Sequence, residues 1–329
     1  MTAPSVVISL VVYNGEAYLE QCLESLNAQT YTDYSLVIVD NNSTDNSLHV
    51  IQRFGASATL IRNKENVGFS CAHNHVIQST YSDFVFVLNQ DCVLSPDYIS
   101  LCVANLMKGN RRASITGSLV RMDGLTDSSQ NGIIDTLGLC IRRTFHISNI
   151  GAGQTVDIIP VVPFKVFGVS ATAALYRREA LFDVLHHNVH PEYFDEDFFM
   201  YKEDVDLAFR LHQKGWEAWC EPRAKGLHVR STKSQLFVRK NPKINSLSYQ
   251  NHLLFLMKNI TWPLALRYGF FILLYEVMKF FFLAFREPST LRALSHAWKL
   301  REAMQRKRPP CDHYRYPIFF GCNIPPHAN

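Results

Sequence analysis

The chain has 329 residues, of which 47% are hydrophobic and 19% are charged, and its formal net charge at pH 7 is +4. So large an apolar share excludes an intrinsically disordered protein, and the scattered Lys and Arg residues lack the basic stripe that nucleic-acid binders need. The eight cysteines include no CxxC pair, which argues against a zinc ribbon and favours reduced thiols in a cytosolic protein.

Strands and helices alternate through the first third of the chain. Residues 6–12 form an apolar, β-branched run without a preceding basic segment, which predicts a first strand instead of a signal peptide. Amphipathic spacing predicts a helix over 16–27, and further elements follow in the same order: a strand at 36–39, a helix from about 46, a strand at 59–61, a helix at 68–79 and a strand at 84–88. This rhythm indicates a parallel α/β sheet.

Polar side chains follow three of these strands. In parallel sheets, ligands bind beyond the carboxyl ends of the strands, so these positions predict a ligand site, although plain polar loops remain an alternative. The clusters are Tyr13 and Asn14, then Asp40 and Asn41, then Asn89, Gln90 and Asp91.

The middle of the chain gives a weaker pattern. Residues 114–163 are rich in turn formers, whereas 166–176 are small and apolar, which predicts one close-packed strand before a helix at 177–185. Acids and aromatic residues then alternate over 192–204, and an apolar stripe ending at Gly215 places Glu203 and Asp204 at a helix N-terminus. The helix dipole explains acids there, but the dense aromatic neighbours favour a partly dry catalytic or sugar-binding pocket.

The region after residue 234 is different in character. Residues 255–285 are strongly apolar but are interrupted by Arg267, Glu276 and Lys279, and a basic cluster follows at 301–308. We expect an interfacial helix pair on an anionic membrane. A buried helical subdomain, an oligomer interface and a true membrane span are the alternatives.

Several segments together resemble a known family. They are "VVISLVVYNGEAYLEQCLESLNAQTY", "VIVDNNSTDNS", "NKENVGFSCAHN", "VFVLNQDCVL" and "FDEDFFMYKEDVDLAFRLHQKGW". In order and spacing, residues 5–234 resemble the family 2 inverting glycosyltransferases of GT-A fold, particularly the rhamnosyltransferase-like branch that builds bacterial surface polysaccharides. The resemblance implies a Rossmann-like, mainly parallel mixed sheet flanked by helices. It also implies a catalytic domain over 1–233, with a nucleotide-binding half to about 113 and an acceptor half from 114, before a helical region at 234–329.

The resemblance also implies roles for single residues. Asp40 corresponds to the residue that binds the donor base, Asp91 to the acid that binds a divalent metal, and His228 to a histidine near that metal. Glu203 and Asp204 correspond to the acidic pair that contains the general base, and the second acid, Asp204, is the expected base. The implied donor-nucleotide site comprises Val11, Tyr13, Asn14, Asp40, Asn42, Asn66, Gly68, Asn74, Asn89 and Gln90.

Two positions depart from the family pattern. The metal motif is Asn89-Gln90-Asp91, with one carboxylate instead of two or three, and Ser170 stands where relatives often have glycine. One carboxylate with diphosphate oxygens and water still satisfies Mg²⁺ or Mn²⁺, since Mg²⁺ usually keeps several waters.

The reaction that the resemblance implies is metal-dependent transfer of a sugar, with L-rhamnose from dTDP-rhamnose as the first expectation. The expected acceptor is a glycan or lipid-linked glycan, and the expected location is the cytoplasmic face of the cell membrane, bound peripherally. A UDP- or GDP-hexose transferase and a non-catalytic nucleotide-sugar-binding scaffold remain alternatives. A Rossmann dehydrogenase is disfavoured, because "VVYNGEAY" lacks the GxGxxG pattern.

Overall fold

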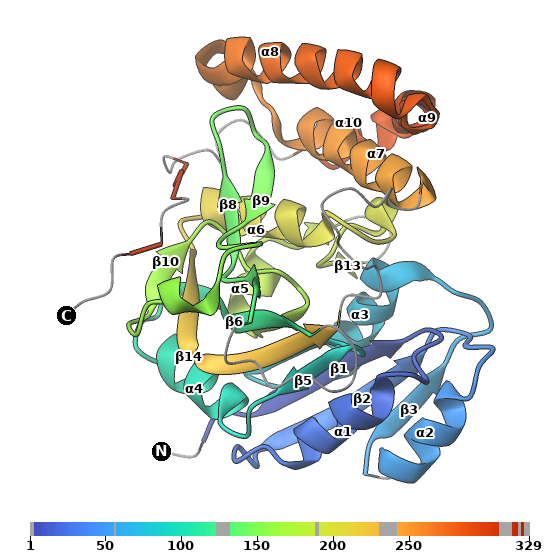
Figure 1. The fold of residues 1–329 in the computed structure, drawn as a ribbon, viewed down its shortest axis with the longest axis vertical. Coiled ribbons are helices and arrows are strands. Elements are labelled where there is room, and N and C mark those ends of the chain that lie inside the picture. The colour runs from blue at the N-terminus through green and yellow to red at the C-terminus, as the bar shows by residue number, and fades with distance from the viewer. Residues whose placement is uncertain are drawn as a thin grey trace.

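The computed structural model describes residues 3–55, 57–122, 132–187, 191–229, 242–308, 318–321 and 324–325. Within these ranges, a mixed sheet flanked by helices forms the body, and a layer of C-terminal helices covers one end of it (Figure 1).

The first part of the sheet is parallel, as the sequence predicts. Its elements are β1 (Val6–Val12), α1 (Leu19–Asn27), β2 (Tyr34–Asp40), α2 (Ser47–Phe54), β3 (Thr59–Arg62), α3 (Gly68–Ser79) and β4 (Phe84–Asn89). The central β1 pairs with β2 on one side and β4 on the other. Val12 lies opposite Asp40, and Val11 lies opposite Asn89, so the polar residues that follow these strands share one edge.

The second part adds both antiparallel and parallel strand pairs. Its elements are β5 (Cys92–Leu94), α4 (Tyr98–Leu106), β6 (Arg112–Met122), β7 (Ile134–Thr136), β8 (Leu139–Ile141), β9 (Ile147–Asn149), η1 (Val156–Ile158), β10 (Phe164–Val166), β11 (Ala173–Arg177), α5 (Arg178–Asp183), β12 (His186–His187), β13 (Pro191–Glu192), η2 (Glu196–Phe198), α6 (Glu203–Gln213) and β14 (Glu217–Val229). The order of the main sheet is β10-β14-β6-β11-β4-β1-β2-β3, with β5 paired to β14.

The single strand predicted over 166–176 is wrong. The chain forms β10 and β11 at the two ends of this segment, and the residues between them leave the sheet. There Gly168 approaches α6 so closely that an added Cβ would lie 2.3 Å from the Cβ of Ala208. The small residues therefore allow a close crossing, and the polar ones that follow face the pocket described below.

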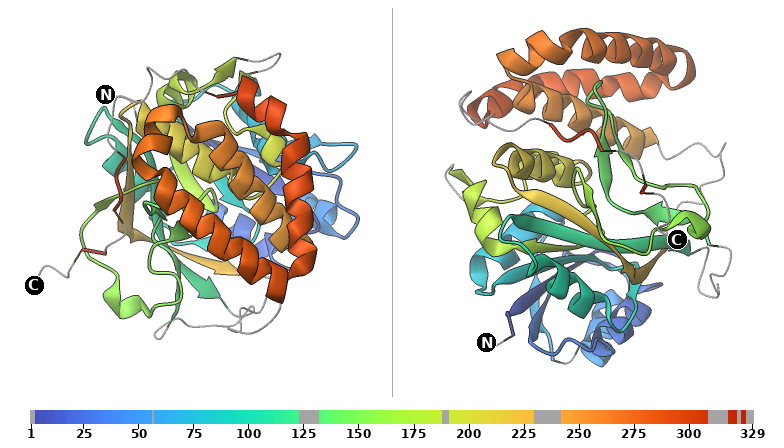
Figure 2. Two further views of the ribbon diagram at one scale, coloured as in Figure 1. Left: turned by 90° about the horizontal axis from the view of Figure 1, so that it is seen from above. Right: turned by 90° about the vertical axis from the view of Figure 1, so that its left-hand side faces the viewer.

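The C-terminal helices form a layer on the body (Figure 2). They are α7 (Pro242–Asn259), α8 (Trp262–Arg286), η3 (Pro288–Leu291), α9 (Arg292–Lys299) and α10 (Arg301–Arg306). Many apolar side chains of α8 are exposed, including Leu266 at 83% and Phe285 at 82%. Despite the charges that interrupt it, α8 is long and apolar enough to cross a membrane by length and composition alone.

A shared apolar cluster joins α7 to the body. Phe209 of α6 packs edge-on against Phe255 of α7 with ring centroids 5.5 Å apart, and the same cluster includes Phe145 and Phe167. The predicted domain boundary at 233–234 lies outside the described residues.

The cysteines agree only partly with the expectation of reduced thiols. Cys22, Cys71, Cys92, Cys102 and Cys220 are free. Cys140 is disulfide-bonded, contrary to that expectation. Cys311 and Cys322 lie outside the described residues.

Candidate active site

One pocket of about 540 Å³ contains both acidic groups that the sequence singles out. Asp91 and His228 lie on one side, and Glu203 and Asp204 lie at the start of α6. The hairpin β8–β9 contributes Ser148 and Asn149 to the wall, and α7 contributes Ile244, Asn245 and Ser248.

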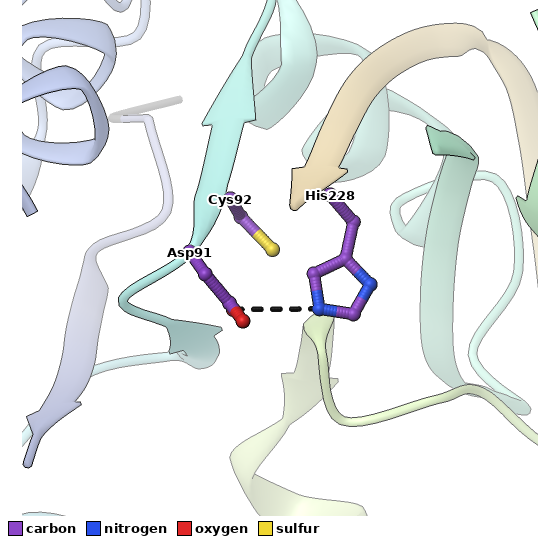
Figure 3. A group of neighbouring side chains, drawn as sticks. All are labelled: Asp91, Cys92 and His228. Carbon is purple, nitrogen blue, oxygen red and sulfur yellow. Dashed lines mark ion pairs between the residues drawn. The ribbon is translucent and has the colours of Figure 1, made fainter. Parts of the chain in front are cut away.

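Two strand ends bring Asp91 and His228 together (Figure 3). β4 pairs with β1 and β11, whereas β5 pairs antiparallel with β14, so Asn89, Gln90 and Asp91 mark the change from one partner strand to another. His228 Nε2 lies 3.4 Å from Asp91 Oδ1, and His228 Nδ1 lies 2.8 Å from Asp135 Oδ2. Burial opposes protonation of His228, but hydrogen bonds to Asp135 and Asp91 outweigh it and raise its pKa to about 9.

These residues fit a divalent cation, which would take the place of the proton on His228 Nε2. Within the described residues, the buried Asp91 Oδ1 has only the long 3.4 Å contact with His228 Nε2, so it has capacity to bind a cation or water as well. Asp135 orients the His228 ring from its other nitrogen, as outer carboxylates commonly do for metal-ligating histidines. Cys92 is nearby, but burial raises its thiol pKa well above the usual range, and hard cations prefer oxygen.

Glu203 and Asp204 differ in their surroundings. Asp204 accepts hydrogen bonds from the backbone N–H groups of Ala171 (3.3 Å) and Val205 (2.8 Å). Glu203 Oε2 is buried and has no hydrogen-bond partner in the described part of the chain. Burial raises the pKa of both carboxyl groups, and the charge of Asp204 raises that of Glu203 further. The charge of Lys202 and the two backbone donors oppose this rise at Asp204, so Asp204 is the weaker proton holder of the pair.

The predicted base-binding residues gather at the ends of β1 and β2. Asp40 is 2% exposed, accepts a hydrogen bond from the Ser43 N–H (3.1 Å) and lies 3.7 Å from Arg62. Tyr13 is 45% exposed, so its ring is available to a ligand. Val11 is partly buried at the end of β1.

The neighbouring Asn and Gln residues mainly determine the backbone conformation at this edge of the sheet. Asn14 and Asn42 adopt left-handed backbone conformations with φ of 49° and 65°. Gln90 bridges the backbone of Tyr13, since its Oε1 accepts from the Tyr13 N–H (2.9 Å) and its Nε2 donates to the Tyr13 carbonyl (3.0 Å). Asn89 lines the pocket.

Asn66 and Gly68 also shape the backbone. Asn66 Oδ1 accepts from Asn41 Nδ2 (2.9 Å) and from the Gly68 N–H (2.9 Å). Gly68 has φ of 84° and packs against Phe199, where a Cβ would lie 2.5 Å from the ring. Only glycine fits this position without strain.

Asn74 does not face the pocket. Its side chain is 1% exposed, and its Oδ1 accepts from the Tyr193 and Phe194 N–H groups. Its Nδ2 donates to the Phe194 carbonyl and to Glu196. The donor-binding role implied for Asn74 lacks geometric support, because its amide groups already hold the chain before α6 against α3.

The acids before α6 also differ from the prediction of a pocket lined by them. Lys258 of α7 lies 2.6 Å from Asp195 and 2.8 Å from Asp206, and all three side chains are fully buried. Lys307 contacts Glu192, Asp195 and Asp197 at 2.6–2.7 Å. Glu192, Asp195, Asp197 and Asp206 therefore form an ion-pair network that fixes the C-terminal helices to the body, whereas Glu196 accepts a hydrogen bond from Asn74.

Sequence reasoning missed Asp135, Lys202 and the pocket residues of α7. Asp135 is an acid within the apolar stretch "IIDTL", which is a weak signal for a buried functional carboxylate. Ser170, the departure from the family pattern, is nearly buried in the pocket wall, and its hydroxyl lies 2.9 Å from that of Thr172.

Comparisons with known proteins find relatives in sequence and in fold. A family model described as "Glycosyl transferase family 2" matches residues 5–185, more than half of the chain. Chondroitin synthase of Pasteurella multocida (strain Pm70) is 30% identical over 125 residues, which are 37% of this chain and 13% of that protein. Poly-beta-1,6-N-acetyl-D-glucosamine synthase of Staphylococcus aureus (strain COL) is 25% identical over 65% of this chain and 47% of that protein. In both cases, the match spans less than half of the relative.

Solved structures share the fold at low identity. GalNAc-T7 with UDP, GalNAc and Mn²⁺ has a TM-score of 0.60 and 14% identity over 78% of this chain and 48% of that chain. The mannosyltransferase PcManGT from Pyrobaculum calidifontis, in complex with GDP-Man and Mn²⁺, has a TM-score of 0.53 and 16% identity over 92% and 76% of the two chains. The predicted GT-A fold, a mixed sheet flanked by helices, is confirmed.

Proposed function

The chain belongs to glycosyl transferase family 2, and on this basis we propose that it transfers a sugar from a nucleoside diphosphate to a hydroxyl group, with inversion. The observation that supports this most directly is that Asp91 and His228 share one pocket with Glu203 and Asp204. Inverting transfer is one displacement, which needs a stabilised leaving group and a base within the same site.

Asp204 is the proposed base. An acceptor hydroxyl is a poor nucleophile, so a carboxylate that takes its proton during attack contributes roughly 10²–10⁴-fold to the rate. The backbone donors at Ala171 and Val205 favour the anionic form of Asp204 that a base requires, against the effect of burial. Glu203 beside it orients the acceptor.

Asp91 and His228 are proposed to hold Mg²⁺ or Mn²⁺ with the diphosphate of the donor. Such a cation supplies Lewis-acid neutralisation of the departing diphosphate. Asp135 fixes the His228 ring by accepting or sharing the proton on Nδ1, so it is a positioning residue for this site.

The proposed donor is dTDP-L-rhamnose, by resemblance to the rhamnosyltransferase-like branch. UDP-sugars are competing donors, because thymine and uracil present the same edge to Asp40. GDP-sugars are a further alternative. A panel of dTDP-rhamnose, UDP-glucose, UDP-galactose, UDP-GlcNAc and GDP-mannose with Mn²⁺, read by nucleotide release and thermal shift, tests this choice. Stabilisation by a UDP- or GDP-sugar but not by dTDP-rhamnose would refute the rhamnose assignment.

A lipid-linked glycan acceptor at an anionic cytoplasmic membrane surface is proposed from the C-terminal helices. The exposed apolar face of α8 is accompanied by basic residues on α8–α10, a combination that suits peripheral membrane binding. We expect L266E/F285E to lose binding to vesicles that contain anionic lipid. The control Tyr81→Glu changes a 99% exposed residue on the loop before β4 and retains binding. Equal vesicle binding by both variants would refute the α8 assignment.

The catalytic roles are tested by Asp204→Asn. We expect this variant to lose transfer while it retains nucleotide binding, because Asp204 acts on the acceptor. Asp97→Asn, an exposed acid near the start of α4, is the control and retains activity. A loss of donor affinity in Asp204→Asn would count against the assignment of the base.

A further inference from the structure

The segment immediately before the acidic pair has a strained backbone. Phe199, Tyr201 and Lys202 have φ of 57°, 70° and 71°, a region that residues with side chains rarely adopt. Such conformations persist only when surrounding contacts enforce them, and they concentrate at functional sites. Met200, Tyr201 and Lys202 line the pocket, and Glu203 follows directly. The path of residues 198–202 therefore sets where the carboxyl groups of Glu203 and Asp204 point.

One side of this segment is held by the N-terminus of α3. The Phe199 carbonyl accepts hydrogen bonds from the Phe69 N–H (2.7 Å) and the Ser70 N–H (3.3 Å). Gly68 leaves room for the Phe199 ring.

The other side is held by one side chain of α7. Asn251 is fully buried, and the two hydrogens of its Nδ2 are shared among the carbonyls of Phe198 (2.8 Å), Met200 (2.9 Å) and Tyr201 (2.7 Å). Three carbonyls of one strained segment thus converge on a single amide group. These contacts span residues 198 to 201 and therefore act directly on the backbone that leads to Glu203.

Asn251 belongs to a continuous stripe on α7. The stripe has helical spacing and comprises Ile244, Ser248, Asn251, Phe255 and Lys258. Its first two residues line the pocket, Phe255 packs on α6, and Lys258 joins the ion-pair network. One face of α7 therefore contacts the pocket with its first residues, the backbone of residues 198–202 with Asn251, and the buried ion pairs with Lys258.

We propose that Asn251 is a positioning residue that holds residues 198–202 in the conformation that presents Glu203 and Asp204 to the pocket. This inference rests on the proposed function for its effect on catalysis, but its structural part can be tested without substrate. It makes α7 a component of the active site in addition to its contact with the other C-terminal helices.

The main test compares Asn251→Asp with Asn105→Asp in the full chain. Both substitutions replace a buried amide donor by an isosteric acceptor; Asn105 donates to Glu221 (3.1 Å) and does not line the pocket. We expect Asn251→Asp to accelerate amide hydrogen exchange in residues 199–206, and Asn105→Asp to leave exchange there unchanged.

Kinetics provide a second readout. In Asn251→Asp, we expect kcat to fall roughly 10²-fold, as for a displaced catalytic group, with the Kd for UDP or dTDP unchanged. In the uncharged variant Asn251→Ser, relaxation of the segment hydrates the carboxyl groups and lowers their pKa, so the acidic limb of the kcat–pH profile moves to lower pH. Asn251→Ser keeps one short donor; it gives an intermediate loss of kcat and replaces Asn251→Asp if that variant does not fold.

The outcomes separate the two proposals. Unchanged exchange in residues 199–206, equal acceleration in Asn105→Asp, or faster exchange with an unchanged kcat and pH profile would each overturn the role of Asn251. If the wild-type chain transfers no sugar from any donor, the proposed function fails, whereas the exchange comparison still decides whether Asn251 clamps the segment.

Discussion

The buried lysine of α7 gives a sharp prediction about stability. Lys258→Met removes a fully buried ammonium that lies 2.6 Å from Asp195 and 2.8 Å from Asp206. Methionine fills similar volume, so the main effect is electrostatic. Two buried carboxylates lose a cation, although Arg210 still pairs with Asp206 (2.8 Å) and Lys307 with Asp195 (2.6 Å).

The size of the effect follows from these contacts. Breaking a buried ion pair by removal of one partner costs about 3–5 kcal/mol, because the remaining charge stays desolvated. The cations that remain place Lys258→Met near the lower end, so we expect the free energy of unfolding to fall by about 3 kcal/mol. For 329 residues, with an unfolding entropy of about 2.1 cal/mol/K per residue, that corresponds to a Tm decrease of roughly 4 °C.

Thermal and urea unfolding measure this change. Lys165→Met is the matched control, because Lys165 pairs with Glu217 at the surface, where the two side chains are 48% and 32% exposed. Exposed pairs contribute about 0–1 kcal/mol, so the control should be nearly neutral. If Lys258→Met lowers Tm no more than Lys165→Met, the network is solvated, and the reasoning about buried charge is wrong.

Three further predictions concern the pocket. Gly68→Ala should destabilise the protein by about 1–3 kcal/mol and lower kcat, because its Cβ would lie 2.5 Å from Phe199; wild-type Tm and activity would contradict this. Burial raises the Glu203 pKa well above its usual value, so this carboxyl loses its proton at a lower pH in the unfolded chain than in the folded protein. The free energy of unfolding therefore falls as pH rises above about 4.3. Glu203→Gln should therefore raise Tm relative to wild type at pH 8 but not at pH 4, and an equal difference at both pH values would refute the shift. Asp91→Asn or EDTA should abolish turnover, and Mn²⁺ or Mg²⁺ should restore it only in wild type; activity that persists in chelator would exclude the metal role.

The parallel half of the sheet could be predicted from the sequence because its signals are local. Hydrophobic runs, helical spacing and strand-end polar residues place α3 and β1 with the observed bounds, and they put Asp40 and Asp91 at one edge. The order of segments also identified the acidic pair at the start of α6. These patterns depend on neighbours within a few residues, and so the sequence alone determines them.

The partners of these residues were decided by the tertiary structure. Asp135 reaches His228 from 93 positions away in the chain, and Asn251 reaches the Tyr201 carbonyl across 50 positions. The acids before α6 looked alike in sequence, yet Asp195 is neutralised by a buried lysine of α7, whereas Asp204 faces the pocket. The physical reason is that burial and ion pairing depend on which distant side chain packs against a carboxyl group. Local hydrophobic periodicity does not determine which side chain that is.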